Sequence, residues 1–303
     1  MMRIRILARN RSNFSNQRFR EEAKHLKCQL QVIDPLCFDI VLGRKLPLLY
    51  KNGKKFEKTD MVMPRMGASI TNYALAVVSQ FEMMGVPVLN SSRSIQHTRD
   101  KLRCVQLMTR HDIDIPKTVI IRQPSGLNDA IESVGGFPII LKLISGTQGV
   151  GVMLVESMRT LESTLDTLWS LGQDILIQEC VKESIGRDIR VIVVGDKVIA
   201  AMRRQARIGE FRSNIHRGGI ATPVELDPEY ARTAIEASKI VGLDIAGVDL
   251  LESYQGPKII EVNASPGMEG IESATGLNVS RMILEHAIHL AEKNKEGTLE
   301  QKL

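Results

Sequence analysis

The sequence predicts an α/β fold in which a small parallel-sheet unit comes first and a larger, β-rich part follows. Strand-like and helix-like segments alternate over roughly the first 90 residues, a pattern typical of a parallel sheet. From about Ser94 the pattern changes to short strands around a glycine-rich loop. The 303 residues are 43% hydrophobic and 25% charged, which is ordinary for a folded protein with a substantial core.

The N-terminal unit is predicted from short apolar runs separated by polar, helix-forming segments. We expect strands at residues 3–8, 31–34 and 60–64, helices at 16–26 and 71–84, and extended chain again at 86–90. Pro35 ends the second strand, and Gly85 suits the C-cap of the second helix. These segments together make one compact α/β unit.

The rest of the chain is predicted to alternate β-rich segments with four helices. The helices are expected at residues 98–111, 157–171, 228–241 and 279–292, with a charged, frayed tail after the last. Strands are expected at 137–144 and 174–179, around Asp249 and around Glu261, and as a hairpin formed by 188–194 and 197–202. Gly195-Asp196 is the turn signal of that hairpin.

Composition excludes several classes of protein. The net charge of +5 favours an anionic ligand or an acidic partner, but aromatic residues make up only 4%, so we expect no direct nucleic-acid partner. No apolar run approaches the roughly 20 residues of a membrane span. The four cysteines show no paired spacing, which indicates a reduced, cytoplasmic protein.

A glycine-rich loop follows Lys142, which interrupts an otherwise apolar strand. Gly146, Gly149 and Gly151 would let backbone N–H groups approach phosphate oxygens closely. The spacing matches neither the P-loop nor the Rossmann glycine motif, and a plain hairpin turn explains the loop equally well when it is taken alone. Lys142 favours the phosphate interpretation, because a buried ammonium needs an anionic partner.

Two predicted strands carry the side chains of a metal site. Side chains alternate along a strand, so Glu261 and Asn263 share one face, and Asp249 joins them if the two strands pair. Two carboxylates and an amide oxygen suit Mg²⁺ or Mn²⁺. Solvated polar faces are the alternative for each residue alone. The set of three, followed by a tight turn at 264–267, favours the metal site.

A basic loop at residues 211–219 is a third candidate. Arg212 and Arg217 lie beside glycines, and guanidinium groups bind carboxylates or phosphates through paired hydrogen bonds. Arg203, Arg204 and Arg207 could extend this basic patch. A solvated basic loop is the alternative, and we favour it for Arg207.

These motifs resemble, in order, those of ATP-grasp enzymes, and in particular the RimK family, which adds glutamate to the C-terminus of the sixth small-subunit ribosomal protein. The superfamily pattern comprises Lys142 with its glycine loop, 178–179, 188–190, 212–214, Asp249 and 261–267. Residues 64–67, 100–102, 146–149 and 211–219 resemble the RimK family more selectively. The resemblance covers nearly the whole chain.

The resemblance implies a fold and a role for each matched residue. It implies a pre-ATP-grasp domain at 1–94, then a two-lobed ATP-grasp domain with a central lid at 95–185 and a catalytic part at 186–303. Asp249, Glu261 and Asn263 would bind two Mg²⁺ or Mn²⁺ ions, and Arg212 and Asn263 would be catalytic. ATP would contact Lys101, Lys142, Gly146, Gly149, Gly151, Glu179, Cys180, Asp188, Arg212, Ser213 and Asn214.

The implied reaction is phosphoryl transfer from ATP to a carboxylate, followed by attack of an amine on the acyl phosphate. Glutamate and an acidic protein C-terminus would be the substrates, and the enzyme would be a homo-oligomer, a dimer or a tetramer. An ATP-grasp ligase acting on a small amino acid or cofactor carboxylate is one alternative. A nucleotide-binding protein without catalysis is another, although the intact set of Asp249, Glu261 and Asn263 argues against it.

Overall fold

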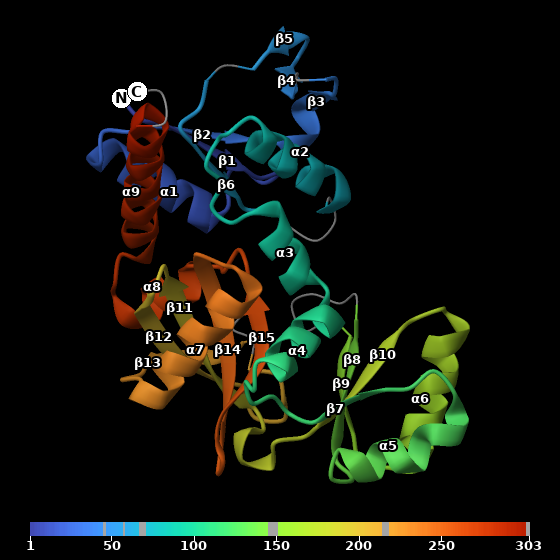
Figure 1. Cartoon of the computed structure of the whole chain (residues 1–303). Coiled ribbons are helices and arrows are strands. Elements are labelled where there is room, and N and C mark those ends of the chain that lie inside the picture. The colour runs from blue at the N-terminus through green and yellow to red at the C-terminus, as the bar shows by residue number, and fades with distance from the viewer. Residues whose placement is uncertain (45–46, 57, 67–70, 145–150, 214–217, 301–303) are drawn as a thin grey trace.

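The structure is a computed structural model, and it describes residues 1–44, 47–56, 58–66, 71–144, 151–213 and 218–300. Within these residues the strands form one parallel and three antiparallel sheets. Figure 1 shows the parallel sheet with its helices at the top, a β-rich lobe below it, and a second, smaller lobe beside that one. The predicted α/β class with an N-terminal parallel sheet is confirmed.

The N-terminal sheet consists of β1 (Arg3–Leu7), β2 (Gln29–Ile33) and β6 (Met61–Pro64) in the order β2-β1-β6. Alternate residues of β1 face opposite sides of this sheet. Ile4 and Ile6 pack with α1 (Phe14–His25) and with α9 (Val279–Glu300), whereas Leu7 packs with α2 (Thr71–Met83). Helices therefore cover both faces, as a parallel sheet requires.

A small antiparallel sheet attached to this unit was not predicted. It consists of β3 (Phe38–Val41), β4 (Leu48–Lys51) and β5 (Lys54–Lys55), and it follows a single 3₁₀ turn, η1 (Pro35–Cys37). The rings of Phe38, Phe56 and Phe81 meet edge to face at 4.9–5.7 Å, which anchors this sheet on α2.

Two helices stand where one was expected at residues 98–111. They are α3 (Ser92–Arg99) and α4 (Lys101–Arg110), and the chain turns between them at Asp100. Asp100 has extended dihedral angles, and its carboxylate accepts a hydrogen bond from the Arg103 backbone N–H at 3.0 Å. Such an N-cap starts a new helix, so the continuous helix of the prediction is wrong.

The smaller lobe is a four-stranded sheet with its own core. Its strands are β7 (Thr118–Ile120), β8 (Ile139–Leu143), β9 (Val152–Val155) and β10 (Ile175–Glu179), in the order β7-β10-β8-β9. Its helices are α5 (Leu127–Ser133), which follows η3 (Pro124–Gly126), and α6 (Met158–Ser170). Buried residues of these strands and helices form a separate hydrophobic cluster that includes Ile139, Leu161 and Ile177.

The larger lobe is a five-stranded antiparallel sheet. Its strands are β11 (Arg187–Val194), β12 (Lys197–Gln205), β13 (Ile220–Pro223), β14 (Ile245–Ser253) and β15 (Gly256–Asn263), in the order β13-β12-β11-β14-β15. One face packs on α7 (Pro228–Val241). The other packs on α8 (Glu269–Thr275) and α9, which is helical as far as Glu300 rather than frayed after residue 292.

The two predicted domain boundaries have different surroundings in this structure. Residue 94 lies within α3, and residue 185 follows η4 (Lys182–Ser184), just before β11. The last helix packs against α1, so the two ends of the chain meet on the first sheet. No helix of the described residues is long and apolar enough to cross a membrane.

Candidate active site

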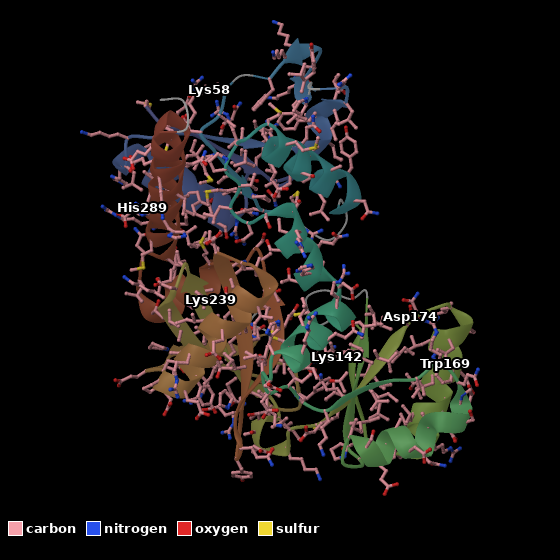
Figure 2. All side chains as sticks on the ribbon, viewed as in Figure 1. Lys58, Lys142, Trp169, Asp174, Lys239 and His289 are labelled. Atoms are coloured by element: carbon pink, nitrogen blue, oxygen red, sulfur yellow. The ribbon has the colours of Figure 1, made fainter. Side chains whose placement is uncertain are left out.

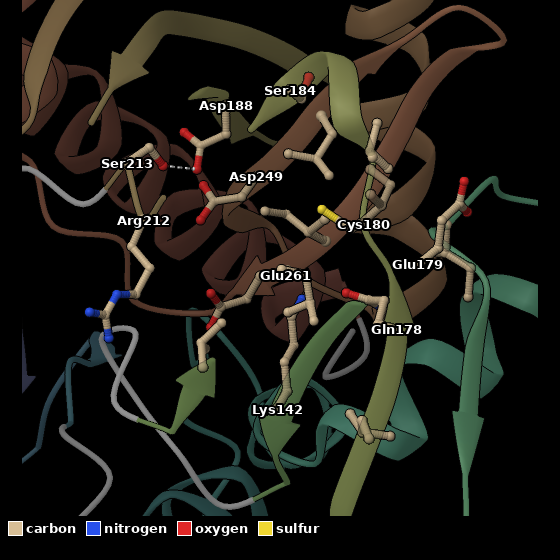
Figure 3. A pocket seen from close by; sticks show the side chains of 18 of the residues that line it. Lys142, Gln178, Glu179, Cys180, Ser184, Asp188, Arg212, Ser213, Asp249 and Glu261 are labelled. Atoms are coloured by element: carbon tan, nitrogen blue, oxygen red, sulfur yellow. Dashed lines mark hydrogen bonds between the residues drawn. The ribbon is translucent and has the colours of Figure 1, made fainter. Parts of the chain in front are cut away.

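A pocket of about 190 Å³ lies between the four-stranded and five-stranded sheets, beside α4. Figure 3 shows carboxylates from the larger lobe and Lys142 from the smaller lobe converging on it. Most of the predicted residues line it, namely Lys101, Lys142, Glu179, Cys180, Asp188, Arg212, Ser213, Asp249 and Glu261. Gly151 and Asn263 are not part of the lining, and Gly146, Gly149 and Asn214 lie outside the described residues.

The two candidate metal carboxylates lie on neighbouring strands. In the antiparallel pairing of β14 with β15, Asp249 is opposite Glu261 and Gly247 is opposite Asn263. Residues that are directly opposite share a face of the sheet, so the three side chains lie together. The register shifts just after Asp249, where a β-bulge interrupts the pairing. Such bulges re-aim side chains and are frequent next to active sites.

The charges around these carboxylates are unequal. Asp249 is buried, which by itself would raise its pKa, but Arg190 and Arg204 hold that pKa below its usual value. Arg190 binds both Asp249 oxygens, at 2.7 and 2.6 Å. The Glu261 side chain is exposed to the pocket. The surrounding protein nevertheless shields its carboxylate from bulk water, and this desolvation, together with the charge of Asp249, raises its pKa. Two facing carboxylates of this kind gain from a shared divalent cation.

Asn263 is the third residue of the predicted metal site. Its side-chain nitrogen is buried and has no hydrogen-bond partner in the described structure. Two carboxylates and one amide oxygen are hard ligands and fit Mg²⁺ or Mn²⁺ better than zinc. The part of the chain that the structure describes has no cluster of three His, Cys, Asp or Glu residues that could hold a different metal.

Two lysines supply positive charge opposite the carboxylates. Lys142 lies on β8, and burial, aided by the charge of Lys101, lowers its pKa to about 8, although Glu261 opposes the change. Lys101 is the first residue of α4, and its ammonium donates to the Leu143 carbonyl at 2.9 Å. Burial lowers the pKa of Lys101 as well. An anionic ligand beside them would raise both pKa values again.

Gly151 ends the glycine loop at a position that only glycine fits. Its φ is +76°, and a Cβ there would lie 2.6 Å from the Leu143 side chain. The Leu143 backbone N–H donates to the Gly151 carbonyl at 2.9 Å, which joins β8 to β9 across the loop. The loop thus begins and ends within one closed hairpin.

The chain leaves the smaller lobe for the larger one through Glu179 and Cys180, a connection called the hinge below. The Glu179 carboxylate accepts a hydrogen bond from the Lys117 backbone N–H at 3.0 Å and lies 3.9 Å from the Lys258 ammonium. Cys180 is buried, and burial raises the pKa of its thiol. The apolar side chains near them, such as Ile140 and Leu176, give this end of the pocket a surface that suits a flat ring.

A buried ion-pair network supports Asp188, and sequence reasoning missed its organisation. Arg204 donates to both Asp188 oxygens at 2.6 Å and also lies 3.0 Å from an Asp249 oxygen. Ser213 donates to Asp188 at 2.6 Å, as the dashed line in Figure 3 shows. One guanidinium therefore fixes two predicted ligand-binding carboxylates relative to each other.

The basic residues of the 203–217 region do not form one open patch. Arg203 pairs with Glu252 at 2.6 Å, whereas Arg204 points into the buried network on the other face of β12. Arg212 pairs with Glu210 at 2.9 Å, and this hydrogen bonding lowers the pKa of Glu210 to about 2. Arg217 lies outside the described residues. Glu210 was also missed, because nothing in the sequence marks it as a partner.

Comparison with known proteins identifies the family. The model of the RimK-like ATP-grasp domain matches residues 98–287, and that of the RimK PreATP-grasp domain matches residues 2–95. The chain belongs to the RimK-like ATP-grasp family. Curated relatives named "Probable alpha-L-glutamate ligase" come from Marinomonas sp. (strain MWYL1), at 49% identity over 94% of this chain and 95% of the relative, and from Ectopseudomonas mendocina (strain ymp), at 46% identity over 97% of each.

Solved structures agree on the fold. The ATP-grasp ligase PsnB complexed with minimal precursor has a TM-score of 0.76 at 20% identity, over 95% of this chain and 99% of PsnB. D-alanine–D-alanine ligase from Bacillus anthracis complexed with ATP has a TM-score of 0.67 at 21% identity, over 98% and 100%. The predicted ATP-grasp architecture and the enzyme class of ATP-dependent ligase are confirmed.

Proposed function

We propose that this protein uses ATP and two Mg²⁺ or Mn²⁺ ions to attach L-glutamate to the C-terminal glutamate of an acidic protein. The observation that carries the proposal is the meeting of Asp249 and Glu261 across one strand pair with the lysines of the smaller lobe facing them. Opposed groups of carboxylates and cations around one pocket suit a metal–triphosphate ligand. The names of the relatives support glutamate as a substrate.

In the proposed reaction, the carboxylate of the acceptor attacks the terminal phosphate of ATP, and the amine of glutamate then displaces phosphate from the acyl phosphate. Lys101 and Lys142 attract the phosphates, and Arg212 faces the charge that develops on the transferred group. Asp249, Glu261 and Asn263 would hold the metal ions, which would neutralise phosphate charge during transfer. No side-chain nucleophile is required, because the chain mainly positions its two substrates.

The nucleotide is proposed to lie along the hinge. Glu179 and Cys180 would meet the adenine, Asp188 the ribose, and Ser213 with Asn214 the triphosphate, beneath the loop that contains Gly146, Gly149 and Gly151. Asp188 already accepts three hydrogen bonds from Arg204 and Ser213. A carboxylate has about four lone-pair sites, so capacity for a ribose hydroxyl remains.

The sixth small-subunit ribosomal protein is the acceptor that we propose, with the enzyme acting as a homo-oligomer in the cytoplasm. All four cysteines are free, which fits a reducing compartment. A ligase for a small amino acid or cofactor carboxylate is the second candidate. This candidate is compatible with the fold, because D-alanine–D-alanine ligase, which is named for a small amino acid, has the same scaffold.

Intact-mass spectrometry tests the proposal. The purified protein is incubated with ATP, Mg²⁺, glutamate and acceptors that end in glutamate, including the ribosomal protein. We expect mass additions of one or more glutamate residues and release of ADP. The proposal fails if no acidic acceptor gains such a mass, while ADP release with a small amino acid alone would favour the second candidate.

The Glu261→Gln variant tests the metal site in the same experiment. It removes one carboxylate charge but preserves size, so the fold should survive while ADP formation falls by a factor of at least about 100. Circular dichroism checks the fold, and the mass assay checks the loss of ligation. Wild-type turnover in this variant would remove Glu261 from the metal site.

A further inference from the structure

Arg65 lies at the junction between the N-terminal sheet and the catalytic lobe. It follows β6 directly, and its backbone N–H donates to the Leu7 carbonyl at 2.8 Å, at the carboxyl ends of β1 and β6. Ligands of open α/β sheets bind outside the carboxyl ends of the parallel strands. Arg65 is therefore placed where a substrate of this unit would be expected.

The side chain of Arg65 reaches the turn that follows the candidate metal ligands. Its guanidinium donates to the Pro266 carbonyl at 2.6 Å, and the Ser265 hydroxyl donates back to the Pro64 carbonyl at 3.2 Å. Pro266 is three residues past Asn263, and three residues span at most about 11 Å. A ligand held by Arg65 would thus lie beside the turn that leads directly out of the candidate metal ligand Asn263.

The guanidinium of Arg65 has positive charge that no carboxylate of the described residues neutralises. Its guanidinium carbon lies over the Phe19 ring, 5.4 Å from the centroid, and no described acidic side chain pairs with it. Burial consequently lowers the pKa of Arg65 to about 10. One carbonyl uses one of the five N–H donors of a guanidinium, which leaves donors for a further acceptor.

Two other arginines show what a purely structural role looks like here. Arg204 is buried between Asp188 and Asp249, whose charges more than offset burial and raise its pKa. Arg18 also joins the N-terminal unit to the catalytic lobe, and it pairs with Glu272 at 3.0 Å and with Glu21 and Glu22. Both have carboxylate partners within the chain. Arg65, which is partly exposed, has none among the described residues.

We propose that Arg65 binds a carboxylate of a substrate at the junction of the N-terminal sheet and the catalytic lobe. The proposal rests on the proposed function, which supplies two substrates that carry carboxylates, the donor glutamate and the acidic acceptor. Paired hydrogen bonds from a guanidinium to a carboxylate are strong and directional. The Pro266 carbonyl and the Phe19 ring hold the guanidinium in one orientation before that carboxylate arrives.

Steady-state kinetics of Arg65→Gln test the proposal, with Arg18→Gln as the matched control that removes a paired arginine from the same junction. KM is measured separately for ATP, for glutamate and for an acceptor peptide that ends in glutamate. We expect Arg65→Gln to raise one of the two carboxylate-substrate KM values more than tenfold and to leave the KM for ATP within twofold. Arg18→Gln should leave all three within threefold.

Analogues in which an amide replaces one carboxylate identify which carboxylate Arg65 binds. Glutamine and the α-amide of glutamate replace the donor, and a peptide that ends in glutamine replaces the acceptor. Wild type should discriminate against one of these analogues, and Arg65→Gln should lose that discrimination. Unchanged KM values, or unchanged discrimination in Arg65→Gln, would overturn the assignment.

Binding measurements separate this proposal from the proposed function. If wild type ligates glutamate but Arg65→Gln behaves like Arg18→Gln, only the Arg65 proposal fails. If wild type adds no glutamate to any acceptor, the proposed function fails, and calorimetry then decides on Arg65 independently. Glutamate and the acceptor peptide are titrated with Mg²⁺ and a non-hydrolysable ATP analogue present. Weaker binding of either to Arg65→Gln supports the proposal, and equal binding, or none of either to wild type, overturns it.

Discussion

Among single residues, Lys142 should give the pocket a pH dependence. Its pKa is lowered to about 8 because the ammonium is buried, and only the charged form attracts phosphates. We expect the affinity for ADP, measured in EDTA so that no metal alters the local charge, to fall about three- to tenfold between pH 7 and pH 9. Isothermal titration across this range checks the slope.

The stability of the nucleotide-free protein should change in the opposite direction. The unfolded chain keeps Lys142 protonated up to the ordinary pKa of 10.5, so between pH 8 and pH 10.5 the unfolded state binds more protons. Stability attributable to this residue therefore rises with pH in that window. Lys142→Met removes both effects. An equal slope of ADP affinity in wild type and Lys142→Met would contradict the assignment.

The side chains of the site differ in how far the sequence could predict them. Glu261 and Asn263 could be recognised together because strand alternation is a local rule. The pairing of Asp249 with Arg190 depends on β11 lying beside β14, which is a property of the assembled sheet. Asp249 on β14 also forms an ion pair with Arg204 on β12, and β11 lies between these two strands. The order of the motifs in the sequence predicted which carboxylates belong to the site, but it did not predict the arginines that pair with them.

Among the elements, the break between α3 and α4 positions Lys101. Asp100 caps α4 and at the same time ends α3, so Lys101 starts a new helix that points its side chain at Leu143. We expect Asp100→Ala to reduce the free energy of unfolding by about 1 kcal/mol, as loss of an N-cap does, and to weaken ADP binding. Urea denaturation and ADP titration measure the two effects.

Asp100→Asn distinguishes capping from charge. Asparagine caps helices about as well as aspartate, so this variant should keep most of the stability and the ADP affinity. If Asp100→Asn is as unstable as Asp100→Ala, the negative charge rather than the cap is what stabilises this turn.

The elements that could be predicted are those with strong local signals. The helix at 228–241 was predicted at its observed bounds, because Asp227 and Pro228 mark its start and Gly242 its end. The small sheet of β3, β4 and β5 was missed, since its strands have only two to four residues. It packs on the rest of the unit through contacts such as that of Phe38 with Phe81, which belongs to α2. Such tertiary support leaves no periodic signal in the sequence.

In the molecule as a whole, two of the hydrophobic clusters should unfold separately. Leu284 of α9 belongs to a cluster that joins the N-terminal sheet, α1 and the five-stranded sheet. Leu161 belongs to the separate cluster of the four-stranded lobe, which also carries Trp169, the only tryptophan in the chain. Figure 2 shows Trp169 on that lobe, far from His289 on α9. Tryptophan fluorescence therefore reports on the smaller lobe alone.

We expect Leu284→Ala to destabilise the cluster that contains Leu284 by about 2–5 kcal/mol. Leu284 and Leu161 are both fully buried, so truncating either one leaves a cavity. In urea, the transition seen by far-UV circular dichroism should move to lower concentration, while the transition of Trp169 fluorescence stays within error of wild type. Leu161→Ala, the same change in the other core, should shift the fluorescence transition and leave most of the dichroism signal in place. Coincident shifts of both signals in both variants would mean that the two lobes unfold as one cooperative unit, so that the hinge at Glu179 and Cys180 couples them even without nucleotide.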